Sequence, residues 1–382
     1  MNYKLATSTW DEKEINALHD VIKSDVYSMG EKVKKYEEEF ANFHETKYAV
    51  MTSSGSTANL IAVAALFFSN QYKLEKGDEI IVPAVSWSTT FFPLQQYGLK
   101  LKFVDIDLDT LNYKISELET AISDSTKAIM VVNLLGNSND FNRINELINN
   151  RNILLIEDNC ESLGAIYDDK YTGTFGVMGT FSSFFSHHIS TMEGGMVVTN
   201  NEELYHILLC LRAHGWTRNL PKFNQVSNKQ DDSFTESFRF VLPGYNVRPL
   251  EMSGAVGLEQ LKKLPIFINQ RRKNARYFQN VFAEDHRFII QKEIGQSSWF
   301  GFSLISKEVD RVEILEKLRQ NNIDTRPIVS GNFVNNEVMR YFDYEVHNDL
   351  GNSNIVDRQG FFVGNSHEDL TDQIDFLKKI LN

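Results

Sequence analysis

Short apolar segments alternate with helical patterns over roughly the first two-thirds of the chain. The apolar segments are rich in β-branched residues and leucine, and they occupy residues 48–52, 79–84, 101–107, 128–136 and 153–158. Such nearly continuous apolar runs are typical of parallel strands that helices cover on both faces. Helical patterns precede and separate them, at residues 11–25, 32–43 and 141–150. This order predicts an α/β fold with a mostly parallel central sheet.

The pattern changes after Pro249. Before this point we expect two more strands and a helix, at residues 181–186, 196–200 and 202–211. After it come a long helical tract, a strand and a second helix, at residues 251–284, 300–305 and 311–321. We therefore predict a large α/β domain over residues 1–248, with helices at its N-terminus, and a small C-terminal α+β domain over residues 249–382.

Composition restricts the classes of function. The 382 residues carry a formal net charge of −12 at pH 7, which argues against a general nucleic-acid or anionic-membrane surface. No apolar run reaches the ~18 residues of a membrane span, and the N-terminal residues show no charged-then-apolar signal pattern. We therefore expect a cytoplasmic protein without nucleic-acid or membrane partners. Its two cysteines, Cys160 and Cys210, cannot supply the full ligand set of an iron–sulfur cluster.

The segment SSGSTANL, residues 53–60, follows a predicted strand and opens a helix. Small residues let the backbone close around an anion, and the start of a helix offers free N–H groups. Gly55, Ser56 and Thr57 are therefore candidates for a phosphate-binding cup. The alternative is a helix that is simply capped by serine.

Two further segments place residues that could contact a flat, cationic ring at the ends of predicted strands. Trp87 in PAVSWSTT follows the strand at 79–84, at the edge where ligands bind in open α/β sheets, and its indole could stack on an aromatic ring. Asp158 ends the strand ILLIED and is costly there unless it is paired, for example with a protonated pyridine nitrogen. Glu161 follows three residues later and could face the same pocket. The alternatives are a core tryptophan and carboxylates that bond to nearby backbone.

The segment FSSFFSHHISTMEGG, residues 181–195, contributes a serine and a base. Ser182 is a candidate second phosphate ligand, and His187 is the candidate base because imidazole can move a proton near neutral pH. The adjacent His188 could suggest a metal, but neighbouring residues in an extended chain point to opposite sides. We therefore expect no metal site, and the role of His188 stays open.

Four cationic or polar side chains later in the chain are candidates for holding a phosphate, a carboxylate or a sugar hydroxyl. They are His214 and Arg218 in RAHGWTRN, Arg248 in PGYNVRPL, and Arg326 in DTRPI. The alternative for each is an ordinary solvated surface side chain.

Taken in this order, the motifs resemble the DegT/DnrJ/EryC1/StrS family, a branch of the fold-type I pyridoxal-phosphate enzymes that act on nucleotide sugars. The resemblance covers essentially the whole chain and makes the large domain the cofactor-binding one. It implies that Gly55, Ser56, Thr57 and Ser182 hold the cofactor phosphate. By the same resemblance Trp87 stacks on the ring, Asp158 meets the pyridine nitrogen and Glu161 lies near the ring hydroxyl. Asn246 is implied to reach the phosphate from a neighbouring subunit, which makes an active homodimer necessary.

The chain departs from most of the family at His187. Most members carry a lysine there, which attaches the cofactor covalently, whereas imidazole cannot form an imine. The resemblance is strongest to members that remove the C3 hydroxyl of GDP-4-keto-6-deoxy-D-mannose in colitose biosynthesis. It implies the product GDP-4-keto-3,6-dideoxy-D-mannose, with L-glutamate converting pyridoxal phosphate to pyridoxamine phosphate and no iron–sulfur cluster. His187 is then the base that takes the proton and can return it to the leaving oxygen.

Three alternatives remain at this stage. A nucleotide-sugar aminotransferase that uses another base would leave nitrogen on the product. A CDP-sugar deoxygenase would carry an iron–sulfur cluster and need an external reductant, which the two cysteines argue against. A cofactor-binding regulatory protein that had lost its lysine would not respond to glutamate.

Overall fold

The computed structural model describes residues 1–382 and contains a large central sheet. Its strand order is β1 (Tyr48–Thr52), β9 (Gly195–Thr199), β8 (Met178–Ser182), β5 (Leu154–Asp158), β4 (Thr126–Val132), β2 (Glu79–Pro83), β3 (Lys100–Val104) and β13 (Tyr344–Val346). Only β9 runs against the others, because both of its pairings are antiparallel and the remaining pairings are parallel. This confirms the predicted α/β fold with a mostly parallel sheet.

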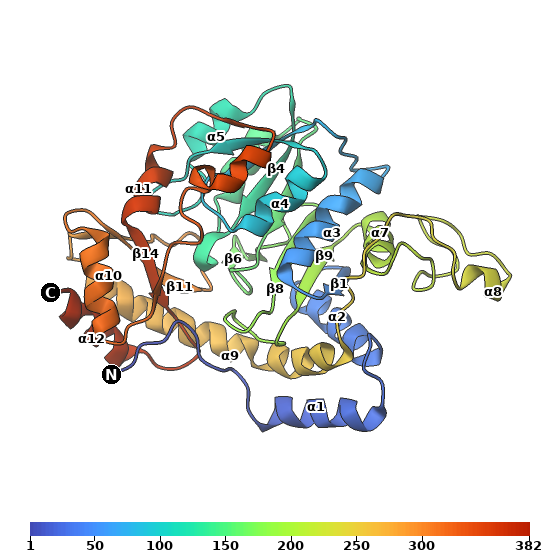
Figure 1. The fold of residues 1–382 in the computed structure, drawn as a ribbon, viewed down its shortest axis with the longest axis horizontal. Coiled ribbons are helices and arrows are strands. Elements are labelled where there is room, and N and C mark those ends of the chain that lie inside the picture. Colours follow the sequence, from blue (N-terminus) through green and yellow to red (C-terminus); the bar gives the residue numbers. More distant parts are fainter.

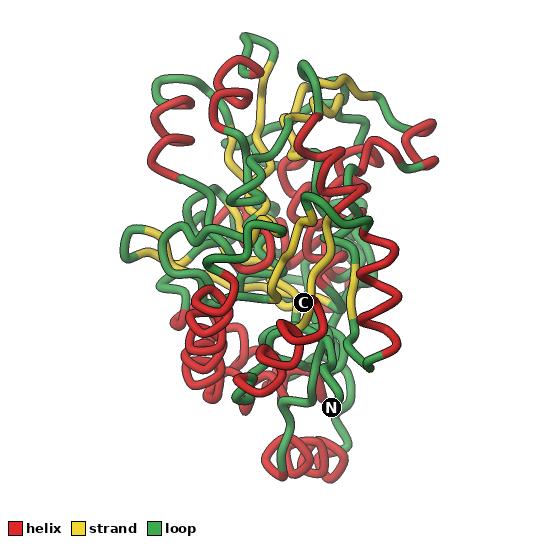
Figure 2. The backbone as a smooth tube through the Cα atoms, turned by 90° about the vertical axis from the view of Figure 1, so that its left-hand side faces the viewer, coloured by secondary structure: helices red, strands yellow, loops and turns green.

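Helices cover both faces of this sheet, as Figures 1 and 2 show from two directions. Alternate residues of each strand point to opposite faces, so Val50 joins one core while Ala49 and Met51 join another. One face packs against α3 (Gly55–Phe68), α4 (Ser88–Gln96) and α7 (Glu202–Arg212). The other packs against α5 (Ile115–Ala121), α6 (Phe141–Ile148), α2 (Glu31–Phe43) and the first half of α9 (Glu251–Phe282). Strands buried on both faces explain the continuous apolar runs of the sequence.

A second, smaller sheet lies beside the first and is antiparallel. Its order is β10 (Phe288–Ile290), β11 (Gly301–Ser306), β14 (Gly360–Gly364) and β12 (Thr325–Arg326). The second half of α9, α10 (Arg311–Gln320) and α12 (Thr371–Leu381) pack against it around a core that includes Phe278 and Phe302. The other helices and strands are α1 (Glu12–Ser24), α8 (Ser233–Glu236), α11 (Gly351–Gln359), β6 (Ile166–Tyr167), β7 (Lys170–Tyr171) and the short 3-10 turns Leu134–Gly136, Phe333–Asn335 and Glu337–Tyr341.

The two sheets exchange segments across the predicted boundary at residue 249. Strand β13 pairs with β3 in the large sheet although it lies near the end of the chain. Conversely, Tyr3 is buried in the core of the small sheet, and the two chain ends lie close together on that side of the molecule (Figure 1). Helix α9 begins in one core and ends in the other. The boundary at 249 therefore stays a prediction.

Three of the predicted strands end several residues early in the structure, and the one expected at 101–107 is β3, which ends at Val104. The other two lead into turns at the candidate site. The strand expected at 128–136 ends at Val132, and the chain then turns through Leu135, whose φ of 52° is left-handed. The strand expected at 181–186 is β8, which ends at Ser182. The residues after Ser182 form the turn that carries His187. None of the helices is long and apolar enough to cross a membrane.

Candidate active site

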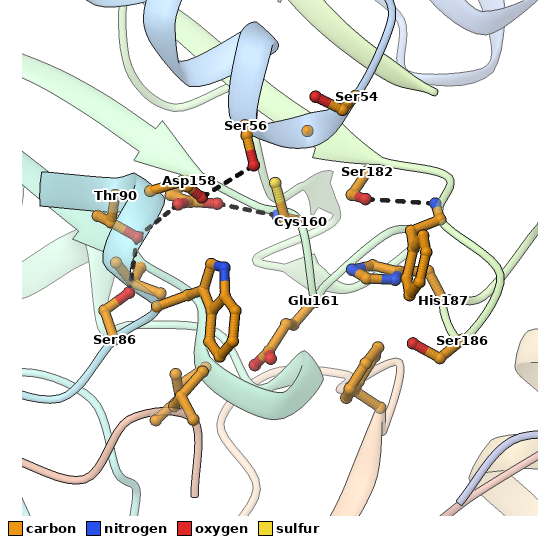
Figure 3. Close-up of a pocket in the computed structure, with 18 of the residues that line it drawn as sticks. Ser54, Ser56, Ser86, Thr90, Asp158, Cys160, Glu161, Ser182, Ser186 and His187 are labelled. Atoms are coloured by element: carbon orange, nitrogen blue, oxygen red, sulfur yellow. Dashed lines mark hydrogen bonds between the residues drawn. The ribbon is translucent and has the colours of Figure 1, made fainter. Parts of the chain in front are cut away.

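A cavity of about 660 Å³ opens at the carboxyl ends of β2, β4, β5 and β8, where ligands bind in open α/β sheets. Segments beside the small sheet close its other side with Phe300, Val329 and Phe362. Eight of the predicted site residues line it: Gly55, Ser56, Trp87, Asp158, Glu161, Ser182, His187 and Arg326. Figure 3 labels five of them, Ser56, Asp158, Glu161, Ser182 and His187, and shows that these converge from separate elements. The sheet edge therefore assembles most of the predicted site.

The start of α3 forms one wall of this cavity. The Thr57 N–H donates to the side chain of Ser54, the helix cap, at 3.2 Å, so Thr57 belongs to the cap and does not line the cavity. The first N–H groups of a helix have no partner within it, which leaves those of Gly55 and Ser56 free for a ligand. The Ser182 hydroxyl lies opposite, so close that a Cβ on Gly55 would sit 2.7 Å from the Ser182 Cβ. The start of α3 is therefore capped by Ser54 and can also bind an anion through the N–H groups of Gly55 and Ser56.

Replacing Gly55 by alanine should weaken phosphate binding in this cup. The added methyl group would force Ser182 and the helix apart, at a cost of about 1–3 kcal/mol in overpacking. Cofactor titration by absorbance, together with thermal unfolding, measures both effects. Gly351 is a matched control because it also opens a helix, α11, but a Cβ there meets nothing closer than 3.4 Å. Equal behaviour of the two variants would contradict the proposed cup.

Asp158 is buried at the end of β5, and its carboxylate is held by three donors. One oxygen accepts from the Asn59 side chain at 2.8 Å and from the Thr90 hydroxyl at 2.7 Å, and the other accepts from the Cys160 N–H at 3.2 Å. Thr90 in turn bonds to Ser86 at 2.8 Å. These contacts fix a negative charge at the cavity floor, which suits a protonated ring nitrogen.

Glu161 lies across the cavity from the start of α3 (Figure 3). Burial raises the pKa of its carboxyl to about 7, against the lowering effect of the Leu135 N–H that donates to it at 3.0 Å. The nearby charge of Asp158 also raises this pKa. Glu161 can therefore hold a proton near neutral pH and share it with an oxygen of a bound ligand.

His187 sits in the turn after β8, and its imidazole points into the cavity (Figure 3). The ring meets Phe300 edge-on, with centroids 5.2 Å apart, and Phe184 at 6.1 Å. Burial lowers the pKa of His187 to about 4, and the positive charges of Arg271 and Arg326 add to this effect. The imidazole is thus neutral at pH 7 and available to accept a proton. Its pKa lies further below neutrality than the residue type alone indicated.

Four predicted residues lie away from the cavity, on the segment that follows α7. They are His214, Arg218, Asn246 and Arg248. Both arginines stack over the Trp216 ring, with the guanidinium carbon of Arg218 4.1 Å and that of Arg248 5.7 Å from the ring centroid. Asn246 is exposed and accepts from Arg248 at 3.0 Å. Within one chain these residues do not join the site.

Sequence reasoning also missed several residues that the structure places at the site. Asn59 and Thr90 orient Asp158, while Phe184, Ser186, Glu193 and Phe300 line the cavity. Thr90 lies in the same segment as Trp87, and its polar side chain next to an apolar strand was a usable signal. Phe300 offered none, because an aromatic residue before a strand is ordinary core composition.

The cavity fits a phosphorylated pyridine cofactor: it has an anion cup, a fixed carboxylate and a neutral imidazole around one space. The family description of DegT/DnrJ/EryC1/StrS aminotransferases matches residues 8–373. The chain belongs to the DegT/DnrJ/EryC1/StrS aminotransferase family. Membership confirms the resemblance seen in the sequence motifs. The residues that line the cavity include a histidine, His187, and no lysine. This is the position at which the sequence motifs set the chain apart from most of the family.

Several members of the DegT/DnrJ/EryC1/StrS family are very similar to this chain. GDP-4-keto-6-deoxy-D-mannose 3-dehydratase of Escherichia coli O55:H7 (strain CB9615 / EPEC) is 61% identical over 387 residues, with 100% of each chain covered. A crystal structure of GDP-4-keto-6-deoxymannose-3-dehydratase with a trapped PLP–glutamate geminal diamine superimposes with a TM-score of 0.99, at 60% identity and with 100% of both chains covered. A mutant of an enzyme of that name, with bound GDP-perosamine, matches with the same score, identity and coverage.

Proposed function

We propose that this chain removes the C3 hydroxyl from GDP-4-keto-6-deoxy-D-mannose, with pyridoxal phosphate as cofactor and L-glutamate as amino donor. The observation that carries the proposal is His187, a neutral imidazole in a cavity that otherwise has the residues for pyridoxal phosphate but lacks a lysine. The similarity to a 3-dehydratase with this substrate, and to structures with a PLP–glutamate adduct and with GDP-perosamine, supports the choice of ligands.

The residues of the cavity divide the work of binding. The start of α3 and Ser182 would hold the phosphate, and Asp158 would hold the proton on the ring nitrogen. Glu161 would share its proton with the ring hydroxyl, and Trp87, whose side chain is 56% exposed at the mouth of the cavity, would cover the ring. When bound, pyridoxal phosphate supplies an electron sink and, after taking the amino group of glutamate, the amine that joins it to the sugar ketone.

His187 performs the proton transfers in this proposal. As a neutral imidazole it would take the proton from the carbon that carries the cofactor's amine, which would allow the C3 oxygen to leave the sugar. The same imidazole then returns the proton to the leaving oxygen. His187 cannot attach the cofactor or act as a lysine amine would. The reaction therefore ends in loss of the hydroxyl and not in a stable amino sugar. Phe300 and Phe362 limit water at this point.

Release of ammonia tests the proposed reaction. In the presence of cofactor, L-glutamate and GDP-4-keto-6-deoxy-D-mannose, we expect about one ammonia for each sugar consumed, because the sugar amine is lost after dehydration. An aminotransferase would consume glutamate and sugar without releasing ammonia. Consumption of glutamate with the nitrogen retained on the sugar would therefore reject dehydration in favour of amination.

A homodimer with shared active sites is the second part of the proposal. The segment after α7 projects from the body of the molecule around α8 (Figure 1). Its aromatic side chains are exposed, with Phe223 at 77%, Phe234 at 86% and Phe238 at 66%, which is typical of a protein-contact surface. It also carries Arg218 and Arg248, which suit the diphosphate of a GDP-sugar. We infer that it reaches the cavity of a second copy, where Asn246 meets the cofactor phosphate.

Mixed dimers test this sharing. Asn246→Asp should inactivate the enzyme by placing a carboxylate beside the phosphate, and His187→Asn should inactivate it by removing the base. Co-refolding or co-expression of the two inactive variants should restore about a quarter of wild-type activity, because half the dimers are mixed and each mixed dimer has one intact site. A mixture of His187→Asn with Asp158→Asn is the control and should stay inactive, since both residues lie in the same chain's cavity. No recovery in the first mixture would contradict shared sites.

A further inference from the structure

The turn that carries His187 packs against a buried segment, residues 297–300, that leads into β11. This segment is called the strap below. Phe300 in this strap makes the edge-on contact with the His187 ring. The strap is bonded to the turn after β4: the Phe300 N–H donates to the Leu135 carbonyl at 2.9 Å, and the Ser298 N–H donates to the Gly136 carbonyl at 3.0 Å. The position of the imidazole therefore depends on how the strap is held.

Arg271 of α9 donates hydrogen bonds to the backbone of the strap. Its side chain is 4% exposed, and its guanidinium donates to the carbonyls of Trp299 and Phe300, both at 3.3 Å, and of Asn365 at 2.9 Å. None of these partners is a carboxylate, and Nε has no partner. A buried cation without a carboxylate partner is energetically expensive, so a contribution to stability does not by itself account for Arg271. Trp299 also has a left-handed φ of 48°, which is strained for a bulky residue.

His188 is the second anchor of the strap. Its side chain is fully buried, and its Nε2 lies 3.1 Å from the Ser298 carbonyl, which requires Nε2 to carry the proton and donate it. Its ring centroid lies 5.9 Å from that of Phe300. Burial keeps the pKa of His188 well below its ordinary value, so the ring stays neutral. His188 thus faces away from the cavity and fixes the strap.

We propose that Arg271 and His188 are positioning residues for His187, because together they lock the strap against which its imidazole rests. Burial is the main cause of the low pKa of His187, and the charge of Arg271 lowers this pKa further. The inference rests on the proposed function only in taking His187 as the base. Other charged groups face His187 as well. Arg326 of the small sheet is a cation like Arg271 and lowers the pKa of His187 as well. The acidic residues Asp158, Glu161 and Glu193 also line the cavity.

Titration of the histidines in the cofactor-free chain tests this directly. The chain has nine histidines, and the signal of His187 in labelled protein is the one that His187→Asn removes. In the wild type its pKa should be about 4. Arg271→Gln keeps donors for the strap but removes the charge, so the midpoint should rise by about one pH unit, whereas Arg271→Lys keeps the charge and should leave it low. An unchanged midpoint in Arg271→Gln would overturn the proposal.

The neighbouring arginine is a matched control. Arg272 also donates to backbone carbonyls of this region, those of Gln296 and Ser297 at 3.0 and 2.9 Å, but its charge is not among those that act on His187. Arg272→Gln should therefore leave the His187 midpoint unchanged; a shift equal to that of Arg271→Gln would reduce the effect to loosening of the strap. If the Arg271 variants do not fold, the kinetics of His188→Asn decide, because this variant loosens the same strap without changing the charge near His187.

Activity gives a second readout that separates this inference from the proposed function. In Arg271→Gln the acid limb of the pH profile of kcat/KM should move toward neutral pH in step with the titration. In His188→Asn kcat should fall while KM for the sugar nucleotide stays the same, because His188 does not line the cavity. An unchanged kcat in His188→Asn would contradict its role as an anchor. A wild-type chain without dehydratase activity would reject the proposed function and leave the titration result standing.

Discussion

Replacing His187 by lysine should convert the enzyme from dehydration toward amination. Lysine places an amine in the cavity, where it can attach the cofactor covalently and return the proton to the sugar's C4 carbon. Loss of the imidazole base should reduce C3 dehydration by about 10²–10⁴-fold. Mass spectrometry of the sugar nucleotide should then detect a product with an amine in place of the ketone.

The matched control for this change is His187→Asn, which removes the base without supplying an amine. It should give neither dehydrated nor aminated sugar. Borohydride reduction followed by intact-protein mass spectrometry should find covalent cofactor in the lysine variant and none in the wild type or in the asparagine variant. A lysine variant with no aminated product and no attached cofactor would show that position 187 is not the position of the family's lysine.

Asp158→Asn should cause the second large loss. The side chain keeps its shape but loses the charge, so the ring-nitrogen proton of the cofactor is no longer stabilised. The new amide also turns a donor either toward Asn59 and Thr90, which donate to one oxygen of the wild-type carboxylate, or toward the Cys160 N–H, which donates to the other. We expect activity to fall by about 10²–10³-fold, with weaker cofactor binding, as is typical when a fixed electrostatic contact to a reacting system is removed. Steady-state kinetics and absorbance titration measure the two effects.

Asp105 provides the control for Asp158. It also follows a buried strand, β3, and is itself buried, where it accepts from the N–H groups of Asn352 and Ser353 at 2.9 and 2.8 Å. It does not line the cavity. Asp105→Asn should therefore lower the thermal stability, while the folded enzyme keeps its cofactor affinity. If both variants lost cofactor affinity equally, the effect of Asp158 would reflect general stability and not contact with the ring.

Much of the fold could be predicted because burial on both faces leaves a clear pattern in the strands. The five segments predicted first in the chain all contain strands of the large sheet. The errors fall where apolar or aromatic residues continue past a strand's end. Leu134 and Leu135 continue the run of β4, yet the chain turns there, and this turn brings the Leu135 N–H to Glu161. The phenylalanines after Ser182 suggested a strand, but they form the turn that carries His187.

Only some residues of the candidate site could be predicted from the sequence. Residues at strand ends or at a helix start, such as Asp158 and Gly55, could be placed from the sequence because the parallel topology brings strand ends to one edge. Phe300 and Arg271 could not, because their roles arise from contacts between distant segments with no local pattern. The placement of Asn246 and Arg218 depends on a second copy of the chain, and their roles stay predictions.

The mass of the sugar nucleotide after reaction tests the central claim most directly. The enzyme would be incubated with cofactor, L-glutamate and GDP-4-keto-6-deoxy-D-mannose, and the product analysed by mass spectrometry. We expect a product that has lost one oxygen and gained no nitrogen. A product with an amine in place of the ketone would make this chain an aminotransferase and contradict the role assigned to His187.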